Sequence, residues 1–442
     1  MSKEVINKKQ YLFSLGMLGA LFFIFGLVSW VNSILVPYFK VACELRSEVQ
    51  GYLANFAFYI AYLVMTIPAS IMLNKTGLKR GVEYGLWILA AGALLFIPAA
   101  LLREYNMFLV GLFTMGTALA ILQTASNPFV TIIGPMESAA RRISVMGICN
   151  KLAGILAPLV FAKAVIRPSD KQVIDQVSAG LLTGIAKEEA LDNMILSVIP
   201  PYLILGVFLF VFGIIFYKSS IPEINPNKEN ESVDSDGKDK KSILAYPYLI
   251  LGAIALFLHV GSQAVSVNTI MGYAQSMGMD ILAAKIFPSM TLGCILLGYL
   301  IGVFVIPKYI SQQQALVICT VTGLILSTLV VLTHGTVHLF GVDTDISIWF
   351  LVLLGIPNSL IYAGIWPLAI RNLGRFTSLG SSIVVMGLCG NAIVPMIYAW
   401  MADSTNSLQK GYWILPVCFA LMIAYAVYGY KIENWRKVRN EK

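Results

Sequence analysis

The sequence predicts an all-α membrane protein with twelve transmembrane helices in two pseudo-symmetric six-helix bundles. Three observations lead to this fold class: the composition is very apolar, apolar stretches of membrane-spanning length recur, and the two halves carry similar motifs. Of the 442 residues, 58% are hydrophobic and 12% are charged, whereas a soluble protein carries about 25% charged residues. A soluble enzyme and a nucleic-acid-binding protein are therefore excluded. We expect the net charge of +8 to reflect cationic loops on the cytoplasmic side of a membrane.

A transmembrane helix needs about 20 mostly apolar residues to cross the bilayer. Twelve stretches meet this requirement: residues 11–37, 50–73, 80–102, 106–133, 142–166, 198–217, 246–274, 281–306, 313–333, 346–370, 378–402 and 411–430. The first stretch is too long for a cleaved signal peptide and lacks a small-residue cleavage site. The six cysteines have no CxxC spacing, which argues against a disulfide framework and against a zinc site.

The distribution of Lys and Arg predicts the orientation of the chain. Most of these residues fall in the termini and in the loops on the same side as the termini. Because cytoplasmic loops are enriched in Lys and Arg, we expect both termini in the cytoplasm. Residues 218–245 are largely polar and carry both charge signs, which is typical of a flexible cytoplasmic linker. This linker would separate an N-terminal bundle, residues 1–217, from a C-terminal bundle, residues 246–442.

The two predicted bundles carry similar motifs in corresponding spans. The matching positions are residues 31–34 and 267–270, residues 145–149 and 385–389, and the two prolines Pro128 and Pro367. The three pairs occur in the same order and at nearly the same separation, which indicates duplication of a six-span unit. Both copies enter the membrane from the cytoplasm. The repeat is therefore parallel, about an axis along the membrane normal, similar to the relation between the halves of major facilitator transporters.

The fourth predicted span resembles the signature of the fucose–proton symporter family, which belongs to the major facilitator superfamily. The resemblance rests on residues 122–131 and 134–135, and it extends to residues 32–37, 260–263, 370–374 and 380–382. Residues 139–151 and 365–370 look more like the hexose and N-acetylhexosamine branch than the fucose branch. The resemblance implies the major facilitator fold and import of a hexose-type sugar by a secondary active transporter. Glucose or galactose is the first candidate, and fucose and N-acetylglucosamine follow.

The same resemblance implies a multi-pass protein of the bacterial inner membrane. A monosaccharide and the lipid bilayer would be its partners, nucleic acid would not, and the protein would act as a monomer. We expect no cofactor and no catalytic or metal site. The coupling ion would be a proton or sodium.

Three positions depart from the pattern of the fucose–proton symporters. Ser33 stands where that pattern has an Asp, Gln123 where it has a Glu, and Gly147 where it has a Gln. The aromatic residue of the tenth helix is kept as Tyr362. The resemblance therefore carries over only part of the sugar contacts and none of the titratable carboxyl groups.

Lys151 is a cation inside a predicted span. It lies about nine residues into the fifth span, which is roughly 13 Å deep at 1.5 Å per residue and close to the midplane. A lysine at this depth is costly and marks a functional site by default. It could carry the coupling proton, or its fixed charge could replace a coupling cation and leave a facilitator. His259 is a second candidate for coupling, although a lone histidine on an apolar helix is more often a packing residue. Sodium is a third possibility, with oxygen ligands from Ser29, Asn32, Ser33, Gln123 and backbone carbonyls.

A sugar presents hydroxyl groups and apolar ring faces, so its site needs amides, hydroxyls and an aromatic platform. Such side chains occur at helical spacing in several predicted spans, and we expect them to line a polar cavity between the halves. The candidates for substrate binding are Asn32, Gln123, Asn127, Asn150, Gln263, Asn358, Tyr362 and Trp366. For any single one of them, hydrogen bonding between helices is the alternative role.

Three other functions stay open at this stage. A sugar uniporter without ion coupling would need the same cavity. A membrane enzyme has little support, because no nucleophile or metalloprotease motif is present, and the HxxxH pair of His334 and His338 is expected in an exposed loop. A channel would need a filter motif that the sequence does not contain.

Overall fold

The computed structural model describes residues 8–45, 48–165, 173, 176–177, 181–222, 242–279, 284, 286–339 and 341–435. The chain forms two compact units. The first unit comprises Met1–Ser126 and Leu152–Ile224, and the second comprises Asn127–Lys151 and Asn225–Lys442. The end of the fourth predicted span and the start of the fifth therefore group with the C-terminal part of the chain. Most of the predicted linker lies outside the described residues, so the division at 218–245 stays a prediction.

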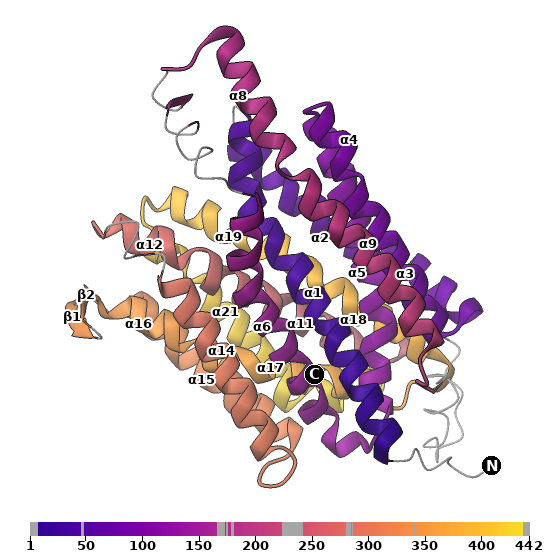
Figure 1. Cartoon of the computed structure of the whole chain (residues 1–442). Coiled ribbons are helices and arrows are strands. Elements are labelled where there is room, and N and C mark those ends of the chain that lie inside the picture. The colour runs from indigo at the N-terminus through magenta and orange to yellow at the C-terminus, as the bar shows by residue number, and fades with distance from the viewer. Residues whose placement is uncertain are drawn as a thin grey trace. The chain divides into compact units, whose positions relative to one another are not determined.

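Helices make up nearly all of the first unit (Figure 1). They are α1 (Lys8–Ala42), α2 (Glu48–Thr76), α3 (Leu78–Leu94), α4 (Phe96–Leu101), most of α5 (Tyr105–Ile132), the end of α6 (Ala139–Val165), α8 (Gly184–Leu196) and α9 (Ile199–Lys218). Helices α3 and α9 pack along each other. Small residues permit this approach: a Cβ atom on Gly206 of α9 would lie 2.8 Å from the Leu94 side chain.

The second unit is also helical, with one short hairpin. It contains α11 (Pro247–Asn268), α12 (Ile270–Ser276), α14 (Ile286–Val305), α15 (Gln312–Leu332), β1 (Thr336–Leu339), β2 (Val342–Asp345), α16 (Ile346–Leu353), α17 (Gly355–Ile370), α18 (Thr377–Met386), α19 (Gly390–Ser404), α20 (Leu408–Gly411) and α21 (Ile414–Val427). Helix α11 packs against α17, α18, α19 and α21. Its backbone meets the start of α19 so closely that a Cβ atom on Gly390 would collide with the Phe257 carbonyl oxygen.

The predicted spans agree with these helices. Within the described residues, eleven helices are long and apolar enough to cross a membrane, and they coincide with eleven of the predicted stretches. The remaining stretch, 142–166, is helical as α6, which carries the cations Arg141, Arg142 and Lys151. The tenth and eleventh stretches are each interrupted, between α16 and α17 and between α18 and α19. Close backbone contacts at Gly355 and Gly390 accompany these interruptions.

The loop between α15 and α16 forms an antiparallel hairpin of β1 and β2. His338 pairs with Asp343 across the strands, with 2.7 Å between Nδ1 and Oδ1. Asp345 caps α16 by accepting hydrogen bonds from the backbone N–H groups of Ser347 and Gly335. Partial burial opposes ionisation of Asp345, but these hydrogen bonds prevail and lower its pKa. Within the described part of the chain, no group of three or more metal-ligating side chains comes together.

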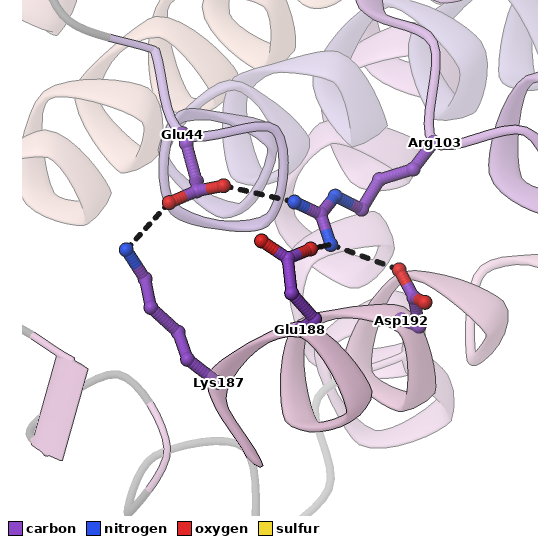
Figure 2. Close-up of polar contacts among 5 residues, drawn as sticks. All are labelled: Glu44, Arg103, Lys187, Glu188 and Asp192. Atoms are coloured by element: carbon purple, nitrogen blue, oxygen red, sulfur yellow. Dashed lines mark hydrogen bonds and ion pairs between the residues drawn. The ribbon is translucent and has the colours of Figure 1, made fainter. Parts of the chain in front are cut away.

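An ion-pair cluster ties α8 to two other corners of the first unit (Figure 2). Arg103, in the turn between α4 and α5, is at its centre and is 18% exposed. Its guanidinium lies 2.9 Å from Glu44 after α1, and 2.7 Å and 2.9 Å from Glu188 and Asp192 on α8. Lys187 also pairs with Glu44. Because Arg103 serves three carboxylates, the cluster depends on it more than on any other member.

We expect Arg103→Gln to loosen α8 from the first unit. The carboxylates are well exposed, so the loss of stability is about 1 kcal/mol and shrinks with added salt. Limited proteolysis between α6 and α9, together with thermal unfolding in detergent, measures the effect. Lys187→Gln, which breaks one peripheral pair, is the matched control. Equal effects of the two substitutions at low salt would contradict the central role of Arg103.

Candidate functional site

Arg142, near the start of α6, holds the turn that joins α5 to α6. Its side chain is only 3% exposed. It donates hydrogen bonds of 2.6–3.2 Å to five oxygens: the carbonyls of Val130, Thr131, Gly134 and Pro135, and the Ser138 hydroxyl. The last carbonyls of a helix have no partner within that helix. Arg142 donates hydrogen bonds to them and thereby joins the end of α5 to the beginning of α6. Asn127 lies on the first of these helices and Lys151 on the second.

A chain of polar side chains runs from α6 through α11 to α17. Lys151 is 8% exposed, and its Nζ donates to Oε1 of Gln263 on α11 at 3.1 Å. Nε2 of Gln263 donates to the backbone carbonyl of Asn358 on α17 at 3.4 Å. The Asn358 side chain returns to α11, where its Nδ2 donates to the Ser266 hydroxyl at 3.4 Å. The predicted interior cation is therefore joined to two predicted sugar-binding residues.

A second polar contact joins α5 to α17. Nδ2 of Asn127 donates to the Tyr362 hydroxyl at 3.1 Å. One turn further along α17, Trp366 stacks on Tyr362, with ring centroids 5.9 Å apart and planes 9° apart. Asn127 and Trp366 are fully buried. Because Asn358 and Tyr362 lie one turn apart on α17, the two sets of contacts form one continuous polar cluster, which we call the α17 cluster.

Several atoms of the α17 cluster are buried without a hydrogen-bond partner among the described residues. They are Oδ1 of Asn127, Oδ1 of Asn358, Nε1 of Trp366 and, on α11, Nδ1 of His259. Buried polar atoms nearly always have partners, and leaving one unpaired costs about 1–3 kcal/mol. Two amide oxygens that can accept and one indole N–H that can donate therefore have unused hydrogen-bonding capacity within the α17 cluster.

The structure brings most of the predicted site residues into the second unit. Asn127, Lys151, Gln263, Asn358, Tyr362 and Trp366 are connected by the contacts above, His259 is buried nearby on α11, and Asn150 is half-buried beside Lys151. Gln123 belongs to the first unit, where its Nε2 donates to the Tyr62 hydroxyl at 3.0 Å. Asn32 and Ser33 fall within α1, but their side chains lie outside the described part of the chain.

Two residues of this region, Arg142 and Tyr299, are not marked by the sequence. The sequence does not single out Arg142, because nothing in its spacing distinguishes it from Arg141, which is exposed. Tyr299 lies in the apolar helix α14 and is 6% exposed. A hydroxyl group within an apolar span was the signal available for it, and many tyrosines of the chain share that signal.

The comparisons with known proteins identify the family. A sequence model described as the Major Facilitator Superfamily matches residues 18–386. The chain belongs to the major facilitator superfamily. This confirms the predicted fold class and makes the protein a membrane transporter rather than an enzyme.

Within the superfamily, the chain is similar to bacterial sugar transporters. The chain is 31% identical to the glucose/galactose transporter of Brucella abortus over 431 residues, which cover 97% of each protein. It is 28% identical to the L-fucose-proton symporter of Escherichia coli over 431 residues, covering 96% of this chain and 94% of that one. The crystal structure of the E. coli fucose:proton symporter matches with a TM-score of 0.78 and 26% identity, over 94% of this chain and 98% of that chain.

We expect Arg142→Met to destabilise the transporter by about 2–4 kcal/mol, because it leaves buried carbonyl oxygens without donors. Thermal unfolding in detergent measures the loss as a lower Tm. Arg141→Met is the matched control, since it removes the same charge from an exposed neighbouring position. If both variants lowered the Tm equally, the role of the hydrogen bonds would be refuted.

Proposed function

We propose that the protein is a secondary active transporter that imports a hexose-type sugar across the bacterial inner membrane by alternating access. Glucose and galactose are the first candidates, and fucose and N-acetylglucosamine follow. The names of the similar proteins support this substrate class. In the proposal both termini are cytoplasmic and the protein acts as a monomer.

The observation that carries the proposal is the set of unpaired buried atoms in the α17 cluster. Each hydroxyl of a sugar can donate one hydrogen bond and accept others. The free amide oxygens of Asn127 and Asn358 suit the donating role of such a hydroxyl, and the indole N–H of Trp366 suits its accepting role. The rings of Tyr362 and Trp366 add an apolar surface of the kind that packs on the C–H face of a sugar.

The proposed binding site includes Asn127, Gln263, Asn358, Tyr362 and Trp366, together with Asn32, Gln123 and Asn150. Most of these side chains are amides, which bind neutral hydroxyl groups without placing a charge opposite the substrate. This chemistry supports an uncharged sugar over a sugar phosphate or a sugar acid.

We assign the coupling role to Lys151, with a proton as the coupling ion and with His259 and Ser33 as its proposed associates. Burial of an ammonium group is costly even with an amide oxygen as a hydrogen-bond acceptor. A change in water access during the transport cycle therefore changes the cost of holding the proton on Lys151. The hydrogen bond to Gln263 connects that change to the α17 cluster, and so to the bound sugar.

The proposed substrate class is tested with the purified protein in liposomes. We expect saturable uptake of labelled glucose or galactose, with competition among glucose, galactose, fucose, mannose and N-acetylglucosamine that ranks their affinities. An inward proton gradient should drive accumulation in the absence of sodium. Accumulation that requires sodium would show that sodium, and not a proton, is the coupling ion. Uptake that only equilibrates the sugar would make the protein a uniporter, and a steady ohmic current would indicate a channel.

The role of Lys151 is tested by two substitutions with different meanings. Lys151→Gln removes the charge, whereas Lys151→Arg keeps a charge that is not released in proteins. If Lys151 carries the proton, we expect both variants to lose gradient-driven accumulation and to retain sugar exchange across the membrane. Preserved accumulation in the Arg variant would show that a group other than Lys151 carries the coupling proton. Lys308→Gln is the control, because Lys308 is exposed at the end of the eighth span.

A further inference from the structure

Tyr299 of α14 lies against α6 at a position that only glycine can occupy. A Cβ atom on Gly147 would lie 2.5 Å from Cζ of Tyr299 and 2.6 Å and 2.9 Å from its two Cε atoms. These three atoms form the end of the ring that bears the hydroxyl. The hydroxyl of Tyr299 therefore projects past the α6 backbone at Gly147.

The position of Tyr299 is held by the packing of α14 against α17. A Cβ atom on Gly298, the residue before Tyr299, would collide with the Ser359 side chain and would lie 2.5 Å from the Ile356 carbonyl oxygen. One turn later, Gly302 meets Leu360 just as closely. Because α14 has no space to move toward α17, the tyrosine ring is held over Gly147.

Gly147 and Ser359 both adjoin the α17 cluster. Gly147 lies one helical turn before Lys151 on the same face of α6, and Ser359 follows Asn358 on α17. Tyr299 and Tyr362 are also close enough to interact electrostatically. The hydroxyl of Tyr299 is thus placed at the edge of the same group of polar side chains.

No hydrogen bond joins the hydroxyl of Tyr299 to the described part of the chain. The side chain is 6% exposed, and its hydroxyl oxygen is not one of the fully buried polar atoms. A hydroxyl that is held in place and has no described partner, at the edge of a cluster with unpaired amide oxygens, fits a ligand that presents several hydroxyl groups in a fixed arrangement.

We propose that Tyr299 is a specificity-determining residue whose hydroxyl hydrogen-bonds one particular hydroxyl of the transported hexose. This inference rests on the proposed sugar transport and names a contact that determines which hexose is preferred. The Tyr299 hydroxyl can donate to the sugar or accept from it. Gly147 is part of the same arrangement, because a side chain at that position would displace the ring and its hydroxyl.

The experiment compares wild-type protein with Tyr299→Phe, which keeps the ring and removes only the hydroxyl. Binding of the best hexose and of its series of monodeoxy analogues is measured for both proteins. We expect the variant to bind the parent hexose about 3- to 10-fold more weakly, the range for one neutral hydrogen bond. The analogue that lacks the contacted hydroxyl should bind both proteins equally, and the other analogues should lose affinity as the parent does.

Tyr309→Phe is the matched control, because Tyr309 is 70% exposed just beyond α14. Gly147→Ala is a second variant. We expect it to weaken binding of the parent hexose more than binding of the analogue that lacks the contacted hydroxyl. An equal loss for every analogue, or no loss at all in Tyr299→Phe, would overturn the role of Tyr299. The wild-type measurements decide the proposed function separately, since they show whether any hexose binds at all.

Discussion

The second unit depends on one constraint, which is that its buried polar side chains need hydrogen-bond partners. The hydrogen bond from Lys151 to Gln263 is the central example. Within an apolar helical protein, a polar side chain has few partners, and they come from its own helix or from a neighbouring one. Lys151 is paired with α11, Gln263 with α17, and Asn358 again with α11. These contacts fix the relative rotation of three helices. They also bring together amide oxygens and an indole N–H that have no partner in the described part of the chain.

The same need for partners is met by Arg142 at the turn that joins α5 to α6. It donates hydrogen bonds to the carbonyl oxygens of Val130 and Thr131 at the end of α5. Asn127 and Lys151 are thereby presented on two helices whose ends are fastened to each other. The helices that carry Asn127 and Lys151 are thus joined by hydrogen bonds outside the α17 cluster.

Close approach of glycine-bearing helices provides the other part of the architecture. Helix α19 meets α11 at Gly390, and α14 meets α17 at Gly298. Such contacts restrict the separation of the helices, because an added Cβ atom would collide with the neighbouring chain. The structure gives a physical reason for the glycine at position 147, where the fucose symporter pattern has a Gln. The space that a glutamine side chain would need is occupied by the ring of Tyr299.

The sequence by itself determined the number and approximate limits of the spans, because hydrophobicity and helix length follow directly from composition. It also predicted Lys151 as an interior cation and identified the polar residues of α5, α11 and α17 as site candidates. The orientation of the chain and the roles of these residues stay predictions.

Only the tertiary structure decided which candidates meet. It separated buried Arg142 from exposed Arg141, placed Gln123 beside Tyr62 in the first unit, and brought Tyr299 over Gly147. Helical periodicity describes the faces of one helix, whereas these contacts depend on the rotation and separation of two helices. Those quantities are set by packing among side chains that are far apart in the sequence.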